Sequence, residues 1–174
     1  MPFSVRRARP DDAPAIARVH TQSWRETYPG LMPAAFLDGM TSAATLERRT
    51  HTWTGQIGRP GQPVYVAEIG GEVVGFASGG PAAEHPGVDA EVYTLYSLKA
   101  AQGLGRALFQ AVVGELQAGG ASTLALWVLD LNPTRAWYAR QGAQEDGEKT
   151  VPIPGGALRE VRMVWNDLGV LLGR

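Results

Sequence analysis

A turn of small residues joins an apolar run to a helical pattern between Leu95 and Ala111. Its sequence, QGLGRA at residues 102–107, fits Q/R-x-x-G-x-G/A, and an apolar residue then recurs at every fourth position up to Leu116. A strand, a tight turn and a helix in this order place backbone N–H groups at a helix start, where the helix dipole is positive. Because Gly103 and Gly105 have no Cβ, a ligand can approach this backbone closely. The turn therefore predicts a pyrophosphate site.

Two familiar phosphate-binding motifs do not fit this turn. A Walker A loop requires Gly-Lys at a fixed spacing, which follows neither Gly103 nor Gly105. A dinucleotide fingerprint requires a third glycine where Leu108 stands, and leucine is too bulky for close packing of the helix on the strand. A nucleotide-binding α/β domain is therefore a weak alternative. Taken alone, the turn is also consistent with an ordinary connection between a strand and a helix.

The segments on both sides of the turn resemble the GNAT superfamily of N-acetyltransferases. A strand at Glu91–Leu98, the turn, a helix, a strand at Leu124–Val128 and the stretch from Asn132 to Gly142 follow in the order typical of that superfamily. Residues 19–33 and 147–165 resemble bacterial members of unassigned substrate. The resemblance implies a mixed α/β fold, an α/β/α sandwich whose mostly antiparallel, twisted central sheet has six to seven strands and about four flanking helices. The length of 174 residues predicts one domain, which would be a single GNAT-type domain over residues 1–174.

Periodicity and turn residues outline the other elements. Gly70-Gly71 is a two-residue hairpin signal, and Gly79–Asp89 is a polar loop rich in proline and glycine. Strands are expected at Phe3–Arg9, Val64–Ile69, Glu72–Ser78, Val151–Ile153 and Glu160–Trp165, and helices from Pro10 to about Tyr28, from Pro33 to about Ile57 with an interruption near Gly39, and over Pro133–Gln141.

Composition restricts the functional classes. The chain has no cysteine, which excludes a disulfide framework and a thiolate nucleophile. No window approaches 18 apolar residues and the N-terminus has no apolar leader, so we expect a cytoplasmic protein with no membrane partner. A net charge of −1 argues against a nucleic-acid surface. His51 and His85 have no partners at metal-ligand spacing, so we expect them at the surface and expect no metal.

The resemblance also implies a cofactor, acetyl-CoA, and the residues that contact it. Its pyrophosphate would lie on the turn, and its pantetheine arm would pair with the backbone of a strand. Asn132 resembles a cofactor-contacting asparagine, although it could simply cap the helix that follows Pro133. The expected cofactor contacts are Tyr96, Ser97, Leu98, Gln102, Gly103, Leu104, Gly105, Arg106, Ala107 and Asn132.

Two residues resemble the catalytic groups of the superfamily. Glu91 is the expected base that draws a proton from the acceptor amine, unless it is a solvated residue at the start of an edge strand. Tyr138 is the expected acid for the leaving thiolate, unless its ring only packs on the core. Alternation along an unbroken strand predicts that Glu91, Tyr93 and Leu95 share one face. Val92, Thr94 and Tyr96 would share the other.

The first helix is expected to wall the acceptor side. His20 and Trp24 fit a core-facing stripe, and the resemblance implies that Trp24, Arg25, Tyr28 and Leu31 contact the substrate. We therefore expect an acetyl-CoA-dependent N-acetyltransferase in which a primary amine, on a small molecule or a peptide, attacks directly in a ternary complex. A non-catalytic acyl-CoA-binding module on the same fold is the alternative. A homodimer is expected by analogy alone.

Overall fold

A single seven-stranded sheet runs through the protein. The computed structural model describes residues 2–98 and 103–172. The strand order is β1-β2-β3-β4-β5-β7-β6, and neighbouring strands are antiparallel except for β4 and β5. The strands are β1 (Ser4–Arg7), β2 (Val64–Ile69), β3 (Glu72–Pro81), β4 (Ala90–Ser97), β5 (Leu124–Leu129), β6 (Gln144–Ile153) and β7 (Gly156–Trp165). The helices are α1 (Ala13–Thr27), α2 (Ala34–Met40), α3 (Ala43–Gln56), α4 (Leu104–Ala118), α5 (Thr134–Arg140) and α6 (Leu168–Leu172), with a 3-10 turn η1 (Pro10–Asp12) before α1.

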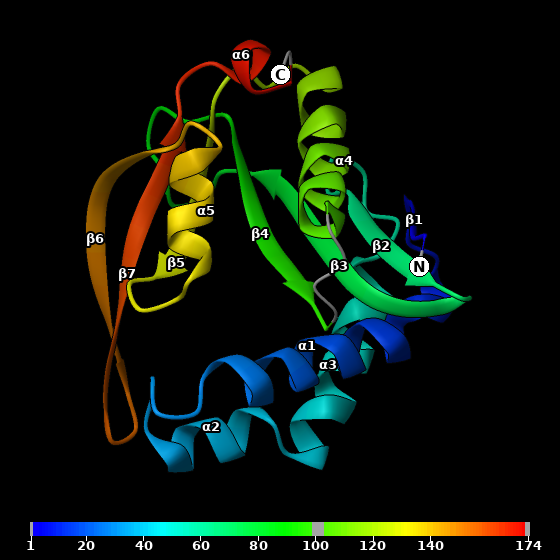
Figure 1. Ribbon diagram of the computed structural model, residues 1–174, viewed down its shortest axis with the longest axis vertical. Helices are drawn as coiled ribbons and strands as arrows, with labels where there is room; N and C mark the ends of the chain where they lie inside the picture. The colour runs from blue at the N-terminus through cyan, green and yellow to red at the C-terminus, as the bar shows by residue number, and fades with distance from the viewer. Residues whose placement is uncertain (1, 99–102, 173–174) are drawn as a thin grey trace.

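Helices cover both faces of the sheet (Figure 1). On one face α1 and α3 bury Ile16 and Trp53 against Phe76 of β3. On the other face the apolar stripe of α4, with Leu108 and Val112 fully buried, packs on β3 and β4. The expected mixed α/β sandwich is confirmed. The described helices are six rather than about four, because the expected helix over 33–57 divides into α2 and α3 and because α6 was not expected.

Two strands extend beyond their predicted ends. β3 continues through Gly79 to Pro81, where the sequence indicated a loop. A Cβ at Gly79 would lie 2.8 Å from both the backbone oxygen of Glu91 and a methyl group of Val112, so glycine here permits close approach of β4 and α4. β6 begins at Gln144 rather than at Val151, and its mostly exposed residues have no apolar alternation that could have signalled a strand.

The register of β4 changes at a β-bulge. Gly79 of β3 pairs with Val92 and Ser78 pairs with Thr94, which leaves one extra residue, Tyr93, on β4. An extra residue reverses the alternation of side chains beyond it. The prediction that Val92 and Leu95 point to opposite faces is therefore wrong, since both pack in the apolar cluster around α4.

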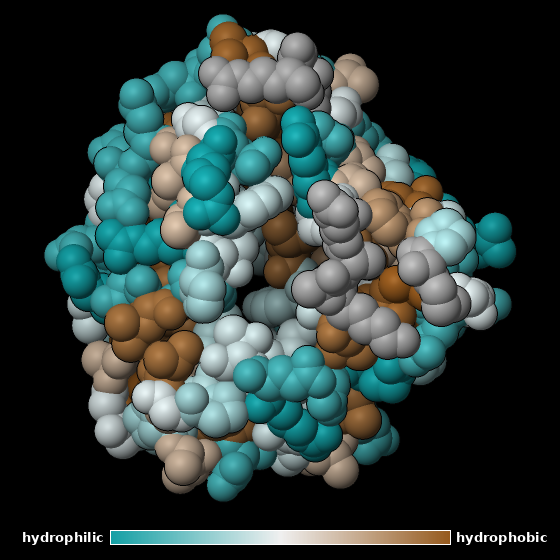
Figure 2. Space-filling view, viewed as in Figure 1, coloured by the Kyte–Doolittle hydropathy of each residue, from teal (hydrophilic) through white to brown (hydrophobic). Residues whose placement is uncertain are grey.

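β4 and β5 are paired only near their N-terminal ends and separate beyond that point. They pair only at Ala90 with Leu124 and at Glu91 with Ala125, and no further pairs join them among the described residues. The later part of β4 thus has β3 on one side and a gap on the other. Figure 2 shows that this face of the molecule is hollowed near its centre. None of the helices in the described part of the chain is long and apolar enough to cross a membrane.

Candidate active site

Two adjoining cavities lie at the gap between β4 and β5. One, of about 420 Å³, is called here the inner cavity and includes Glu91 and Tyr138 in its wall. The other, of about 480 Å³, is called the cleft and reaches the start of α4 at Gly103 and Gly105. The two share the lining residues Tyr28, Leu95, Tyr96, Asn132 and Thr134. A molecule in the cleft can therefore reach a molecule in the inner cavity.

The start of α4 forms one end of the cleft. Gly103 is the N-cap of the helix, with a φ of 84° that favours glycine, and it has no side chain to accept bonds from the first-turn amides. Gly105 and Arg106 also line the cleft, and a Cβ at Gly105 would meet no protein atom within 4 Å. This geometry suits an anion at a helix start, as the sequence predicted.

The other expected residues of the turn lie elsewhere. Leu104 is buried in the core beneath α4, and the amide of Ala107 donates to the carbonyl of Gly103 within the helix. Neither lines the cleft. Leu104 is nevertheless the first residue of α4, so its amide is among the first-turn donors that have no partner within the helix, whereas the amide of Ala107 is already bonded. Gln102 lies outside the described residues.

The backbone of β4 forms one wall of the cleft. The amide of Leu98 donates to the carbonyl of Val74 on β3 at 2.8 Å. Because an antiparallel strand directs alternate residues to one neighbour, Tyr96 and Leu98 belong to the set that bonds β3. The backbone groups of Leu95 and Ser97 then point toward the gap. Of the three strand residues expected to contact the cofactor, Tyr96 and Ser97 line the cleft, and Ser97 directs its backbone toward the gap. Leu95, which was not among the three, also lines the cleft with its backbone in that direction.

Asn132 caps α5 and lines both cavities. Its Oδ1 accepts hydrogen bonds from the amide of Thr134 at 2.9 Å and from the Thr134 hydroxyl at 2.7 Å, which confirms the capping interpretation. Its Nδ2 donates to the hydroxyl of Tyr28 at 3.1 Å, which connects the end of α1 to the start of α5 across the shared wall.

Glu91 meets a buried histidine at the end of the inner cavity where β4 and β5 pair. It lies on a central strand, not an edge strand, and its side chain is 16% exposed. Nε2 of His85 lies 2.8 Å from its Oε1, within ion-pair range, although the ring N–H is not aligned as a hydrogen bond. His85 is fully buried and stacks on Trp127 with ring centroids 5.3 Å apart. The prediction that His85 is a surface residue is therefore wrong, whereas His51 is exposed as expected.

Burial and neighbouring charges set the protonation of this pair. The pKa of Glu91 is raised to about 7, chiefly by burial and also by the negative charges of Glu84 and Glu160, while the positive charge of Lys149 lowers it. Burial, followed by the positive charge of Arg162, lowers the pKa of His85. Near neutral pH, Glu91 therefore exchanges a proton beside a neutral histidine, which is the condition that a general base requires.

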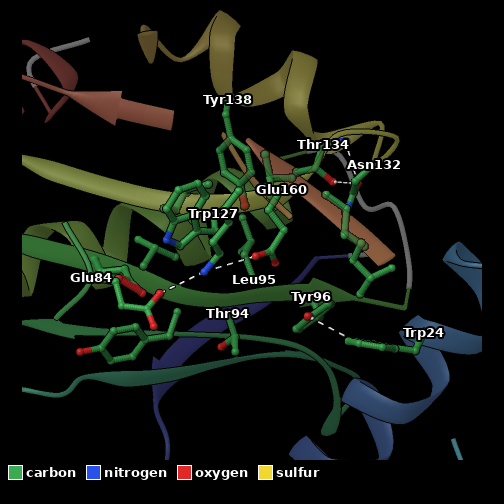
Figure 3. A pocket seen from close by; sticks show the side chains of 18 of the residues that line it. Trp24, Glu84, Thr94, Leu95, Tyr96, Trp127, Asn132, Thr134, Tyr138 and Glu160 are labelled. Carbon is green, nitrogen blue, oxygen red and sulfur yellow. Dashed lines mark hydrogen bonds and ion pairs between the residues drawn. The ribbon is translucent and has the colours of Figure 1, made fainter. Parts of the chain in front are cut away.

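Tyr138 points from α5 into the inner cavity (Figure 3). Its ring also packs against Phe109, Trp137 and Trp165, with centroids 5.3 to 6.1 Å away. Burial raises the pKa of the phenol above its ordinary value, so the hydroxyl keeps its proton at neutral pH. Packing and proton donation are thus compatible in this residue.

An ion-pair chain crosses the wall of the inner cavity and was missed from the sequence. Nζ of Lys149 lies 3.0 Å from Glu84 and 3.4 Å from Glu160, and 4.4 Å from the ring centroid of Trp127. Lys149 and Glu160 are direct partners across the β6–β7 hairpin. Counting back from the two-residue turn Pro154-Gly155 would have paired them, so a signal was available.

The expected acceptor residues of α1 and the turn after it lie in different places. Trp24 and Tyr28 line the inner cavity, and Tyr28 lines the cleft as well. Leu31 lines a smaller neighbouring hollow of about 210 Å³. Arg25 donates to the carbonyl of Thr41 at 2.6 Å and lines none of these spaces, so the structure does not bring it to the site.

His20 and Trp24 both contact Tyr96, which lines the inner cavity. His20 stacks on Tyr96 at 4.8 Å, and burial lowers its pKa to about 3, so the ring is neutral. Trp24 donates its indole N–H to the hydroxyl of Tyr96 at 3.3 Å. The expected core-facing stripe is confirmed for His20, while Trp24 both packs and lines the cavity.

Known proteins share this architecture and sequence. The model of the acetyltransferase (GNAT) family matches residues 17–143. The uncharacterized N-acetyltransferase YuaI of Bacillus subtilis is 34% identical over 172 residues, which cover 97% of this chain and 95% of YuaI. A ribosomal-protein-alanine N-acetyltransferase of Brucella melitensis is 26% identical, with a TM-score of 0.72 over 93% of this chain and 98% of the other. The acetyltransferase YncA of Salmonella typhimurium, solved with acetyl-CoA, is 23% identical, with a TM-score of 0.69 over 94% and 92%. By sequence and by fold, the chain belongs to the GNAT family of acetyltransferases.

Proposed function

We propose that this protein transfers an acetyl group from acetyl-CoA to a primary amine by direct attack in a ternary complex. The observation that carries the proposal is the junction of the two cavities, because it joins a cleft suited to a phosphate ligand to a cavity with a carboxylate of raised pKa. Family membership and the acetyl-CoA bound by YncA support the choice of cofactor.

The cleft fits a pyrophosphate with an extended arm. Gly103, Gly105 and Arg106 would hold the pyrophosphate at the start of α4, where the N-cap residue is a glycine and has no side chain to cap the helix. The gap-facing backbone of Leu95 and Ser97 would pair with the arm in the manner of an added strand, and an N–H there would polarise the acetyl carbonyl. Bound acetyl-CoA supplies an activated acetyl thioester at the junction.

The protein's own groups would then manage two protons. Glu91, with a pKa of about 7, accepts the proton of the acceptor ammonium directly or through water, which produces the neutral nucleophile. Tyr138 keeps its proton at neutral pH and donates it to the departing sulfur from the same cavity, and the second proton that the amine nitrogen loses as the amide forms restores the phenol. Tyr28 and Asn132, which line both cavities, keep the two reactants in register.

An acetyl-CoA consumption assay over a broad panel of amines and peptides tests this function. We expect release of free thiol to depend on the amine and mass spectrometry to show an acetylated product. Calorimetry on the same protein measures acetyl-CoA affinity separately. Tight acetyl-CoA binding without transfer to any amine would contradict catalysis and support the alternative, an acyl-CoA-binding module on this fold.

A further inference from the structure

The inner cavity carries an excess of negative charge. Its wall includes three carboxylates, Glu84, Glu91 and Glu160, and one ammonium, Lys149, with no arginine or aspartate among the described lining residues. Three negative charges against one positive leave −2 when every group is ionised. Because the cavity is partly closed, salt screens these charges less than it screens charges on an open surface.

An ammonium group, that of Lys149, already lies in this wall among Glu84, Trp127 and Glu160, which Figure 3 labels. Lys149 lies between the carboxylates of Glu84 and Glu160 and over the face of Trp127. Carboxylates and an indole face are the partners that stabilise an ammonium most strongly. These partners come from β5, β7 and the loop before β4, so the place is assembled from separate parts of the chain. An incoming ammonium would therefore meet the same kinds of group that already hold Lys149.

The same ion pairs disfavour an acceptor with a carboxylate. Such a group would need the ammonium of Lys149, which Glu84 and Glu160 already hold. Withdrawing Lys149 would also leave Glu160, whose side chain is 25% exposed, without its described ion-pair partner. Adding an anion to a cavity that is already negative costs further free energy.

Resting on the proposed acetyl transfer, we propose that the acceptor is a dication, an amine with a second ammonium, which Glu84 recognises at the mouth of the inner cavity. Glu84 suits this role because Lys149 bonds to its Oε2, a carboxylate can accept at both oxygens, and its side chain is 68% exposed whereas that of Glu91 is 16% exposed. The reacting amine reaches the deeper carboxylate while the second ammonium remains beside the outer one.

The second charge would also favour ionisation of the base. Glu84 and Glu160 raise the pKa of Glu91, and the ammonium of Lys149 lowers it. A further ammonium beside Glu84 acts in the same direction as Lys149. Binding of a dication therefore shifts Glu91 toward the charged form that accepts a proton.

A matched set of four-carbon amines tests the proposal. 1,4-Diaminobutane, butylamine and 4-aminobutanoate have similar length and differ in the charge of the distant group. We expect kcat/KM to fall in that order, by about tenfold or more at each step, or ~1.4 kcal/mol. The three-carbon and five-carbon sets, measured alongside, prevent a wrong spacing from hiding the preference. High salt should reduce the preference.

Two matched glutamate variants identify the residue responsible. Glu84→Gln should reduce the ratio between diamine and monoamine by about tenfold, or ~1.4 kcal/mol. Glu148→Gln is the control, because Glu148 is an exposed residue next to Lys149 that pairs with Arg159 and does not line the inner cavity. It should leave the ratio unchanged. An equal loss in both variants would contradict recognition by Glu84.

Binding without acetyl-CoA separates the two proposals. Trp127 and Trp24 line the inner cavity, so tryptophan fluorescence should report saturable binding of 1,4-diaminobutane that Glu84→Gln weakens. Transfer to all three amines at similar rates, or a preference for 4-aminobutanoate, would overturn the proposal of a dicationic acceptor. Either result would leave the proposed acetyl transfer supported. Diamine binding without any transfer would support the recognition site and refute the proposed reaction. Neither binding nor transfer would overturn both.

Discussion

Nε2 of His85 lies 2.8 Å from Oε1 of Glu91, and the two residues come from a loop and a strand that share no local sequence pattern. The histidine is fully buried, stacks on Trp127 and is held neutral by burial, while burial raises the pKa of the glutamate to about 7. A carboxylate that titrates near neutrality beside a neutral imidazole is the arrangement on which the following pH predictions depend.

Glu91→Gln should lower kcat/KM by about 10²- to 10⁴-fold, because the amide keeps the shape and cannot accept a proton. The pKa of Glu91 is raised to about 7, so below that pH the wild-type base is itself protonated. The difference between wild type and variant should therefore grow as pH rises through 7. A pH profile of kcat/KM for both proteins checks this, and a ratio that is constant across the neutral range would contradict a base role.

His85→Phe should keep the stack on Trp127 and remove the polar ring atom beside Glu91. During turnover we expect Nε2–H to donate to the ionised carboxylate, which favours the charged form. Its removal should raise the pKa of Glu91 and move the acidic limb of the kcat/KM profile to higher pH. His51→Phe, at an exposed position of α3, is the matched control and should not move the limb. A limb that moves to lower pH would refute donation by His85.

Tyr138→Phe should reduce kcat by about 10²- to 10⁴-fold while acetyl-CoA affinity changes little, since the ring and its aromatic packing remain. Single-turnover kinetics measures the chemical step directly. Tyr65→Phe serves as the control, because its hydroxyl bonds to Glu115 away from both cavities. Full kcat in Tyr138→Phe, with chemistry rate-limiting, would make this tyrosine a packing residue. Thiolate would then leave unassisted, as a thiol pKa near ~8.5 permits.

Gly105→Val should weaken acetyl-CoA binding by about tenfold or more, ~1.4 kcal/mol, because the new side chain would project into the cleft. Gly114→Val in the same helix is the matched control, since a Cβ at either position meets no protein atom within 4 Å and Gly114 lines neither cavity. Calorimetry with each folded variant measures its affinity for acetyl-CoA and so checks this prediction. Unchanged acetyl-CoA affinity in Gly105→Val would show that the pyrophosphate does not bind at the start of α4.

Trp24→Ala should raise KM for the amine more than KM for acetyl-CoA, because Trp24 lines the inner cavity and not the cleft. Tyr28→Ala should raise both, since Tyr28 lines the two cavities and holds Asn132. Steady-state kinetics with each substrate varied separates these patterns. Equal effects of Trp24→Ala on the two KM values would indicate a general loss of packing.

Local patterns predicted the elements that have strong periodicity. The apolar stripe of α4, the hairpin at Gly70-Gly71 and the central strands were all predictable, because each depends on residues close in sequence. β6 was largely missed because its residues are mostly exposed on both faces. The alternation along β4 was mispredicted because Tyr93 is an extra residue that only the pairing with β3 reveals.

Some residues of the candidate site could be predicted from the sequence and others could not. The turn pattern pointed to Gly103, and the resemblance to the superfamily pointed to Glu91 and Tyr138, which lie in elements that the sequence predicted. His85 could not, since its burial depends on Trp127, which lies 42 positions further along the chain in the sequence. Arg25 was misplaced because helical spacing does not distinguish a side chain that faces the cavity from one that bonds to Thr41.

The β6–β7 hairpin supplies part of the inner cavity and lies outside the match to the family model. The match to the family model ends at residue 143, one position before β6 begins, and both Lys149 and Glu160 lie beyond it. The start of α4 and the backbone of β4, which would hold acetyl-CoA, lie within the match. Of the four charged residues described in the wall of the inner cavity, Glu84 and Glu91 lie within the match and Lys149 and Glu160 lie beyond it, so a substitution in this hairpin can change the charge of the inner cavity while the start of α4 and β4 stay the same.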